Sequence, residues 1–205
     1  MEKIKVGIIG CGHLGKMHLK NIKAIEKERK DVELQGIFDI DIEKSKLIAV
    51  ENKTKYFNSI DEILNEINTA FIVSPTSTHF DIALRTISKN IHSFIEKPVT
   101  DELENAYLLR ADRDGHSKTI VQVGHIERFN PALLSVEKYN IKPLFIESHR
   151  LAQYNPRGTD VSVVQDLMIH DIDIILSLVK SRVKQIDANG VAIITDKFDI
   201  ANARL

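Results

Sequence analysis

The sequence has little cysteine and no long apolar run. A single cysteine, Cys11, occurs among 205 residues, which excludes an intramolecular disulfide and a cysteine-rich zinc site. No apolar run approaches the roughly 20 residues of a membrane-spanning helix, and the charged start "MEKIKVGIIG" leads into a strand-like run rather than a signal peptide. The net charge of -1 comes without a basic block. We therefore expect a cytoplasmic protein with neither membrane nor nucleic-acid partners.

The chain is 43% hydrophobic and 28% charged, the composition of a globular protein with ample core. In its first part, short apolar runs alternate with helical patterns. Strands are predicted at 4–9, 32–38, 69–73, 91–95 and 119–123, and helices at 14–28, 42–51, 76–89 and 101–113. Such alternation predicts an α/β fold, a doubly wound parallel sheet of the Rossmann type with helices on both faces.

The pattern changes after residue 124. The sequence predicts a helix after Pro131, a strand at about 143–150, a polar segment at 151–161, a helix at 162–179 and strand-like stretches at 183–188 and 198–205. We therefore predict two domains, 1–124 with the parallel sheet and 125–205 as part of a mixed α/β domain. The alternation in "FDIANARL" still runs where the chain stops, so we expect a C-terminally truncated chain.

A glycine-rich loop follows the first predicted strand. Gly10, Gly12 and Gly15 have the G-x-G-x-x-G spacing, which permits a tight turn, close approach to a pyrophosphate and close helix packing. The helix that starts here offers free N–H groups and the positive end of its dipole. The variable positions would contribute mainly their backbones: Cys11, His13 and Leu14. A glycine-rich turn without a ligand is the alternative interpretation.

The context of the loop favours a dinucleotide site. Asp39 ends the second predicted strand, 24 residues beyond Gly15, close to where an acid hydrogen-bonds the adenosine ribose. An acid there favours NAD over NADP, because it repels the 2'-phosphate. His18 falls on the apolar stripe of the first helix, and we expect it to be a packed, hydrogen-bonded histidine.

Two further strand ends carry polar residues where ligands of a doubly wound sheet gather. The stretch "SPTSTHF" follows Val73 and is either a proline followed by a helix cap or a lining for the cofactor. Its candidate contacts are Ser74, Pro75, Thr76 and His79.

The second of these strand ends is "EKP", Glu96, Lys97 and Pro98. It is either an exposed turn or a cation in the nicotinamide crevice that stabilises a developing alkoxide. A cis form of Pro98 would help to fix that turn.

The stretch "DLMIHDID" begins at Asp166, in the last predicted helix. At 100° per residue, a polar stripe roughly 80° wide contains Ser162, Asp166, His170, Asp173 and Ser177. The stripe has three interpretations: a solvated face, a metal-binding pair of Asp166 and His170, or a catalytic histidine with a carboxylate one turn away. No further cluster completes the ligands of zinc, so we expect no metal. Asp171 lies off the stripe and should cap or pair locally.

Taken in order, these motifs resemble the Gfo/Idh/MocA family, named after glucose-fructose oxidoreductase and inositol dehydrogenase. The resemblance rests on "GIIGCGHLGKMH", "SPTSTH", "EKP", "VGHIERFNP" and "DLMIHDID". It implies a Rossmann domain followed by an α/β domain whose open sheet carries substrate and subunit contacts, and hence a homodimer or homotetramer. It further implies that Lys97, Asp166 and His170 are catalytic, with Asp173 a further acid of the motif. The implied activity is NAD-dependent oxidation of a ring secondary alcohol.

Within the family, residues 147–173 resemble members that act on the 3-hydroxyl of UDP-N-acetylglucosamine for lipid A or surface polysaccharide. Candidate contacts to sugar or diphosphate are Arg128, Asn130, Tyr154 and Arg157, which are equally well explained as surface-loop residues. A dehydrogenase of inositol or a free pyranose would need no phosphate-binding arginine. A non-catalytic NAD-binding sensor would need the phosphate loop but neither Lys97 nor His170.

Overall fold

The computed structural model describes residues 3–116, 118–139, 141–153 and 161–205. The chain divides into two compact units, Met1–Gly124 (unit 1) and His125–Leu205 (unit 2). None of the helices in the described ranges combines the length and the apolar character needed to cross a bilayer.

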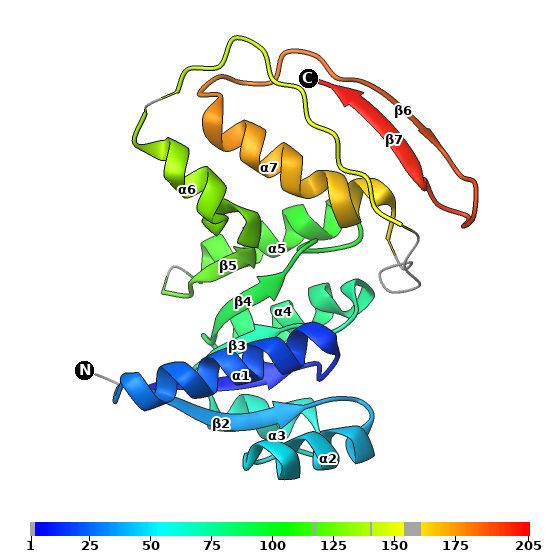
Figure 1. Cartoon of the computed structure of the whole chain (residues 1–205). Coiled ribbons are helices and arrows are strands. Elements are labelled where there is room, and N and C mark those ends of the chain that lie inside the picture. The colour runs from blue at the N-terminus through cyan, green and yellow to red at the C-terminus, as the bar shows by residue number, and fades with distance from the viewer. Residues whose placement is uncertain (1–2, 117, 140, 154–160) are drawn as a thin grey trace. The chain divides into compact units, whose positions relative to one another are not determined.

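Unit 1 is built on a five-stranded parallel sheet with the strand order β2-β1-β3-β4-β5 (Figure 1). The strands are β1 (Ile4–Ile9), β2 (Val32–Phe38), β3 (Thr69–Ile72), β4 (His92–Glu96) and β5 (Val121–Gly124). They confirm the five predicted strands with small shifts at the ends. Apolar runs of this kind are expected where both faces of a parallel sheet are covered.

A rudimentary strand position extends this sheet beyond β2. Tyr56 forms an isolated parallel bridge with Ile37, and counting it gives the order 3-2-1-4-5-6 of dinucleotide-binding Rossmann sheets. The order of the strands reverses between β1 and β3, which pair with each other in parallel. Ligands of such sheets bind at the carboxyl ends of the strands beside this reversal, so the loops after β1, β3 and β4 are the candidate site.

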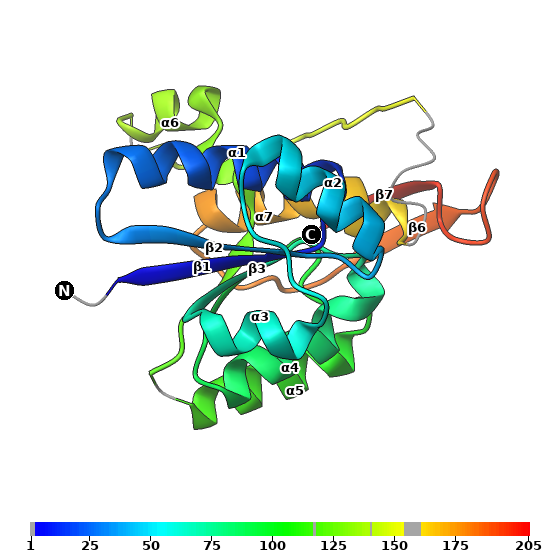
Figure 2. The same cartoon turned by 90° about the horizontal axis from the view of Figure 1, so that it is seen from below.

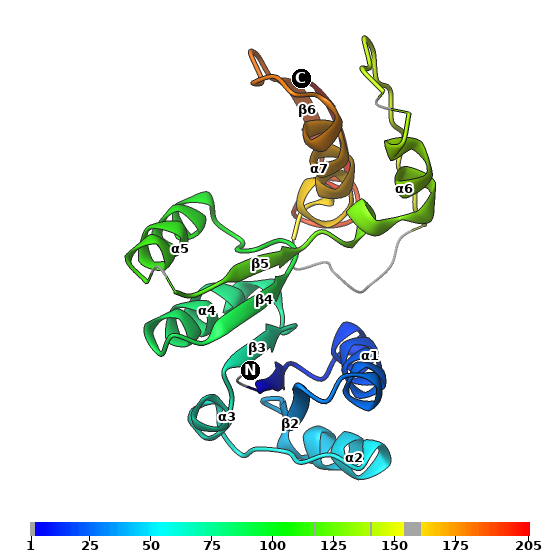
Figure 3. The ribbon, with the colours of Figure 1, turned by 90° about the vertical axis from the view of Figure 1, so that its left-hand side faces the viewer.

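Helices cover both faces of the sheet (Figures 2 and 3). One face carries α1 (His13–Glu28) and α2 (Ile42–Asn52); the other carries α3 (Ile60–Glu66), α4 (His79–Ser88), which follows the short η1 (Thr76–Thr78), and α5 (Leu103–Gly115). The two faces bury separate apolar clusters, one around Ile8 and Leu19 and the other around Ile63, Ile72 and Ile87. The core thereby fixes the strand ends that carry the candidate site.

The sequence analysis did not predict α3, although its start has a recognisable signal. The Ser59 hydroxyl accepts the Glu62 N–H at 3.2 Å, and the Glu62 carboxylate accepts the Asn58 N–H at 2.9 Å. This S-x-x-E arrangement satisfies donors at a helix start. The same S-x-x-E spacing is visible in the sequence "NSIDEILNE" and indicates the start of this helix.

Unit 2 combines helices with a small antiparallel sheet. Its elements are η2 (Ile126–Phe129), α6 (Pro131–Glu137), the π-helical turn η3 (Val164–Met168), α7 (Ile169–Leu178), β6 (Asp187–Val191) and β7 (Ile200–Arg204). The strands β6 and β7 pair antiparallel. Apolar side chains of η3, α7 and this hairpin, among them Met168, Ile172 and Phe198, line a groove of about 430 Å³.

Two predictions for unit 2 need correction. The expected strand at 143–150 has no regular secondary structure and no strand pairing in the described part of the chain. Its apolar residues Leu144 and Phe145 are exposed, and a β-strand forms only where a neighbour accepts its ladder hydrogen bonds. The strand expected at 183–188 begins only at Asp187, where pairing with Arg204 starts.

Candidate active site

The phosphate loop connects β1 to α1 and has the geometry of an anion site. Gly12 is the N-cap of α1, and no side chain caps the helix there. The first turn of α1 contains no acidic residue. The first N–H groups of the helix and the positive end of its dipole therefore face the loop.

The three glycines of the loop differ in what surrounds them. Gly10 has φ +101°, and a Cβ there would lie 2.6 Å from the Ser74 nitrogen. A Cβ on Gly15 would collide with the carbonyl oxygen of Gly10. A Cβ on Gly12 would meet nothing within 4 Å. The fold itself requires Gly10 and Gly15, whereas Gly12 borders open space, so the loop fits a pyrophosphate approaching at Gly12.

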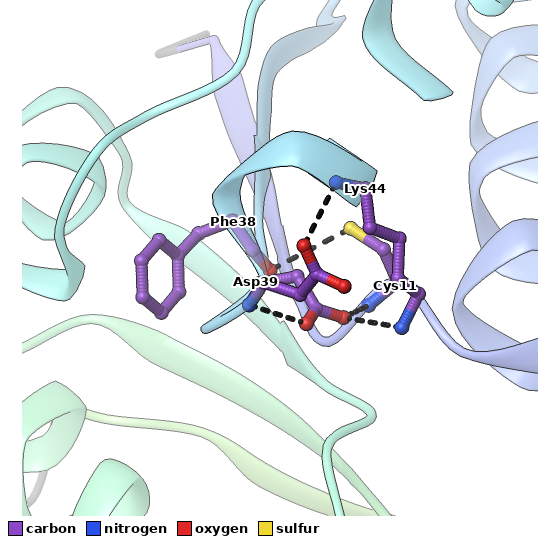
Figure 4. A network of polar contacts seen from close by, with 5 residues as sticks. Cys11, Phe38, Asp39 and Lys44 are labelled. Carbon is purple, nitrogen blue, oxygen red and sulfur yellow. Dashed lines mark hydrogen bonds and ion pairs between the residues drawn. The ribbon is translucent and has the colours of Figure 1, made fainter. Parts of the chain in front are cut away.

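Asp39 follows β2 and binds the same loop (Figure 4). Its Oδ2 accepts the Cys11 N–H at 2.7 Å and lies 3.0 Å from Nζ of Lys44, while Oδ1 accepts the Asp41 N–H at 3.1 Å. Burial raises the pKa of Asp39, but the hydrogen bonds from Cys11, Lys44 and Asp41 outweigh it and hold the pKa below its usual range. The carboxylate is therefore charged and fixed beside the loop.

Cys11 lies beside Asp39 and is buried. Burial, and next the charge of Asp39, raise the pKa of its thiol to about 11. Because the thiolate is the nucleophilic form, the side chain is inert at neutral pH. The Cys11 backbone N–H binds Asp39, and a contact of Cys11 with the cofactor stays a prediction.

The loop after β3 contains Ser74, Pro75, Thr76 and His79. His79 is buried, with Nδ1 2.9 Å from the Pro98 carbonyl oxygen and Nε2 2.9 Å from the Ser74 carbonyl oxygen. Both ring nitrogens thus face backbone acceptors. The His79 side chain binds the loops after β3 and β4 to each other, a role that the sequence analysis did not foresee when it placed His79 against the cofactor.

The motif "EKP" consists of the last residue of β4 and the first two residues of the loop after it. The Lys97–Pro98 peptide bond is cis, as the sequence analysis suggested. Glu96 Oε1 lies 2.7 Å from Nε2 of His18, whose ring packs beside Phe71 and Phe94. This confirms that His18 is a packed, hydrogen-bonded histidine. Lys97 itself is half-buried.

Asp166 and His170 lie on one continuous helical stretch, but its first part is not α-helical. Asp166 belongs to the π-helical turn η3, whereas His170 belongs to α7. Single π-turns within helices are rare and frequent at functional sites. The expected local cap or pair of Asp171 needs correction, because its carboxylate binds Nε of Arg150 at 2.8 Å, 21 positions away in the sequence.

Arg128 and Asn130, two residues predicted to contact the substrate, bind other residues within unit 2. Arg128 binds both carboxylate oxygens of Asp173 at 2.6 Å each, which holds the pKa of that carboxyl below its usual range. The Asn130 side chain accepts the Ala132 N–H at 3.0 Å as the N-cap of α6, and donates to Glu127 at 3.0 Å. These side chains have structural roles that the sequence analysis missed.

The roles of several candidate residues stay predictions. Tyr154 and Arg157 lie outside the described residues. Lys97 belongs to unit 1 and Asp166 and His170 to unit 2, and their union in one catalytic site stays a prediction. The described ranges contain no group of three or more histidine, cysteine, aspartate or glutamate side chains placed to hold a metal ion.

Comparison with known proteins adds to this geometry. Residues 4–125 match the model of the Gfo/Idh/MocA family, described as an oxidoreductase family with an NAD-binding Rossmann fold. A UDP-N-acetylglucosamine 3-dehydrogenase from Acidithiobacillus ferrooxidans is 37% identical over 99% of this chain. A solved structure of that dehydrogenase superposes with a TM-score of 0.88 over 99% of this chain. An inositol 2-dehydrogenase from Arthrobacter is 27% identical over 85% of the chain.

The matches cover these relatives only in part. The chain spans 63% of the length of the Acidithiobacillus dehydrogenase, 65% of its solved chain and 53% of the Arthrobacter protein. Within that span the family match includes the phosphate loop, Asp39 and the "EKP" strand end. The chain therefore belongs to the Gfo/Idh/MocA family of oxidoreductases.

Proposed function

We propose that the protein is an NAD-dependent dehydrogenase that oxidises a ring hydroxyl of a nucleotide sugar, the 3-hydroxyl of UDP-N-acetylglucosamine, to a ketone. The observation that carries this proposal is the 37% identity to a UDP-N-acetylglucosamine 3-dehydrogenase over 99% of the chain. The proposal extends to synthesis of lipid A or surface polysaccharide, to a cytoplasmic location and to a homodimer or homotetramer formed through the C-terminal sheet.

The choice of NAD rests on Asp39. Its charged carboxylate is held beside the phosphate loop by the Cys11 amide, at the position where an acid hydrogen-bonds the ribose hydroxyls. The 2'-phosphate of NADP would meet this negative charge. Lys44, 3.0 Å from Asp39 Oδ2, offsets part of the repulsion, so the proposal predicts a preference for NAD and not an absolute exclusion of NADP.

The chemistry divides among three side chains. His170 accepts the proton of the substrate hydroxyl at a ring nitrogen, and the Lys97 ammonium stabilises the negative charge that develops on that oxygen. Asp166 orients the imidazole or binds a neighbouring hydroxyl. When bound, NAD supplies the hydride acceptor. Residues 74–76 would line the cofactor where it crosses the sheet.

The second candidate is an inositol or free-pyranose dehydrogenase. One observation favours it: Arg128, the described arginine proposed for the diphosphate, is already engaged by both oxygens of Asp173. Diphosphate binding at Arg128 would have to compete with this bidentate pair, whereas an inositol makes no such demand. A non-catalytic NAD-binding sensor is the third candidate, and it gives no reason for Lys97 and His170 to be present.

A substrate screen tests the proposal. Enzyme expressed from the complete gene is mixed with NAD or NADP and with UDP-N-acetylglucosamine, other nucleotide sugars, inositols or free sugars, and reduced cofactor is followed by absorbance. We expect the largest kcat/KM with NAD and UDP-N-acetylglucosamine. A larger kcat/KM with an inositol would support the second candidate. An NAD-loaded sample that reduces no cofactor with any of these compounds would support the sensor.

A further inference from the structure

The strand end that carries Lys97 is held on both sides by a histidine. His18 of α1 binds Glu96, the residue before Lys97, and His79 of α4 binds the carbonyl of Pro98, the residue after it. We infer that His18 and His79 are positioning residues that fix Lys97 for catalysis. This inference rests on the proposed role of Lys97.

The first contact reaches Lys97 through a carboxylate. His18 Nε2 lies 2.7 Å from Glu96 Oε1, and Glu96 Oε2 accepts the backbone N–H of Lys97 at 3.3 Å. Only 19% of the His18 side chain and 14% of the Glu96 side chain are exposed. Hydrogen bonds shielded from water in this way are stronger than exposed ones. With one oxygen bound to each partner, the Glu96 carboxylate connects α1 to the Lys97 backbone.

The surroundings leave the His18–Glu96 pair little freedom to move. The His18 ring centroid lies 5.2 Å from that of Phe94 and 5.4 Å from that of Phe71, and the two phenylalanine rings stack at 4.9 Å. The backbone of β5 is close as well, because a Cβ on Gly124 would lie 2.9 Å from both Glu96 Oε2 and Phe94 Cζ. The carboxylate is therefore packed against an aromatic cluster and the backbone of β5.

The second contact ties together two loops of the candidate site. His79 is 1% exposed, and its nitrogens lie 2.9 Å from the carbonyl oxygens of Pro98 and Ser74. Carbonyl oxygens only accept hydrogen bonds, so a neutral imidazole donates to one of them and an imidazolium to both. In either form the ring spans the ends of the neighbouring strands β3 and β4.

These contacts matter for catalysis because lysine is a flexible side chain. Its ammonium sits on a four-carbon stem, so the position of its charge depends on where the backbone is held. A displacement of about 1 Å at a reacting group can cost roughly 100-fold in rate. In this arrangement His18 and His79 act only through Glu96 and Pro98.

Single substitutions test the first consequence. We expect His18→Leu and His79→Leu each to lower kcat by about 10- to 100-fold. In His18→Leu the NAD dissociation constant and the substrate KM should stay within about twofold of wild type, because His18 binds Glu96 and not the loop proposed to line the cofactor. His18→Gln should recover most of the loss, because its amide nitrogen can donate at the place of Nε2. His116→Leu, in the same unit at the end of α5, should retain wild-type kcat. Loss of NAD binding in parallel with kcat in His18→Leu, or no rescue by His18→Gln, would contradict the positioning role of His18.

A double-mutant cycle shows whether the histidines act through Lys97. Lys97→Met should lower kcat by about 100- to 1,000-fold, as expected for loss of an oxyanion-stabilising group. In that background His18→Leu or His79→Leu should add less than about twofold, because there is no ammonium left to position. Equal losses in both backgrounds would overturn the inference alone. Wild-type kcat in Lys97→Met would instead overturn the role of Lys97 itself, and the inference with it.

Amide hydrogen exchange provides a readout without turnover. In NAD-bound His18→Leu protein, the Lys97 amide should exchange faster than in wild type, because Glu96 is no longer held to accept it, while β1 amides should be unchanged. Unchanged exchange at Lys97 would overturn the His18 contact as a positioning device. If His79→Leu does not fold, His79→Gln can be used instead, because its side chain keeps one hydrogen-bond donor. Its kcat should fall less than the loss expected for His79→Leu, because one of the two contacts can still form. Wild-type kcat in His79→Gln and His79→Asn alike would overturn the role of His79.

Discussion

His170→Ala is expected to lower kcat by about 100- to 10,000-fold, the range for loss of a general base. The substitution removes the group proposed to take the hydroxyl proton, and it leaves the phosphate loop and Asp39 in unit 1 intact. The NAD dissociation constant should therefore stay within about twofold of wild type. Steady-state kinetics and titration with NAD, both on enzyme from the complete gene, measure the two quantities.

A second histidine in the same unit controls for the loss of an imidazole. The His149 side chain is 73% exposed and pairs only with Glu147 among the contacts described for it, so His149→Ala should leave kcat unchanged. If His170→Ala turns over at the wild-type rate, another group accepts the proton and the assignment of the base is wrong.

Gly12→Ala is expected to weaken NAD binding by about 10- to 100-fold, corresponding to the roughly 1–3 kcal/mol cost of forcing extra volume into a tight contact. The thermal stability without cofactor should not fall, because a Cβ at Gly12 meets nothing within 4 Å among the described residues. The combination separates loss of a ligand site from loss of the fold. Calorimetric titration with NAD and thermal unfolding of the apoprotein measure the two effects.

Substitutions at two other glycines serve as controls for Gly12→Ala. A Cβ at Gly115 also meets nothing within 4 Å, so Gly115→Ala should change neither NAD binding nor stability. Gly10→Ala should lower stability, since Gly10 has φ +101° and its Cβ would lie 2.6 Å from the Ser74 nitrogen. If Gly12→Ala binds NAD as tightly as wild type, the pyrophosphate does not approach the loop at this residue.

The fold of unit 1 was largely predictable because its signals are local. Buried parallel strands are continuous apolar runs in the sequence. The glycine motif of the phosphate loop marks both the end of β1 and the start of α1. Asp39 was also predictable, because its distance from the loop is set by the length of one helix and one strand. The helix α3 was missed although its Ser59 and Glu62 carry a local capping signal.

What the sequence did not reveal depends on distant partners. Arg128 looked available for a phosphate because its partner Asp173 is 45 positions away. The contact of His79 was not predictable because nothing local indicates that the Pro98 carbonyl, 19 positions away, lies beside its ring nitrogen. The segment 143–150 has strand-like residues, but no neighbouring strand pairs with it in the described ranges. The π-turn at Asp166 is a backbone adjustment that the apolar periodicity of the helix does not encode.

We propose that the enzyme expressed from the complete gene transfers hydride from carbon 3 of UDP-N-acetylglucosamine to NAD. The most direct measurement uses UDP-N-acetylglucosamine deuterated at carbon 3, with enzyme from the complete gene, and determines the mass of the reduced cofactor. We expect the reduced NAD to carry the deuterium. If hydride transfer limits the rate, kcat/KM should also fall with the labelled substrate. Reduced NAD without deuterium, or deuterium transferred only from another labelled ring carbon, would contradict it.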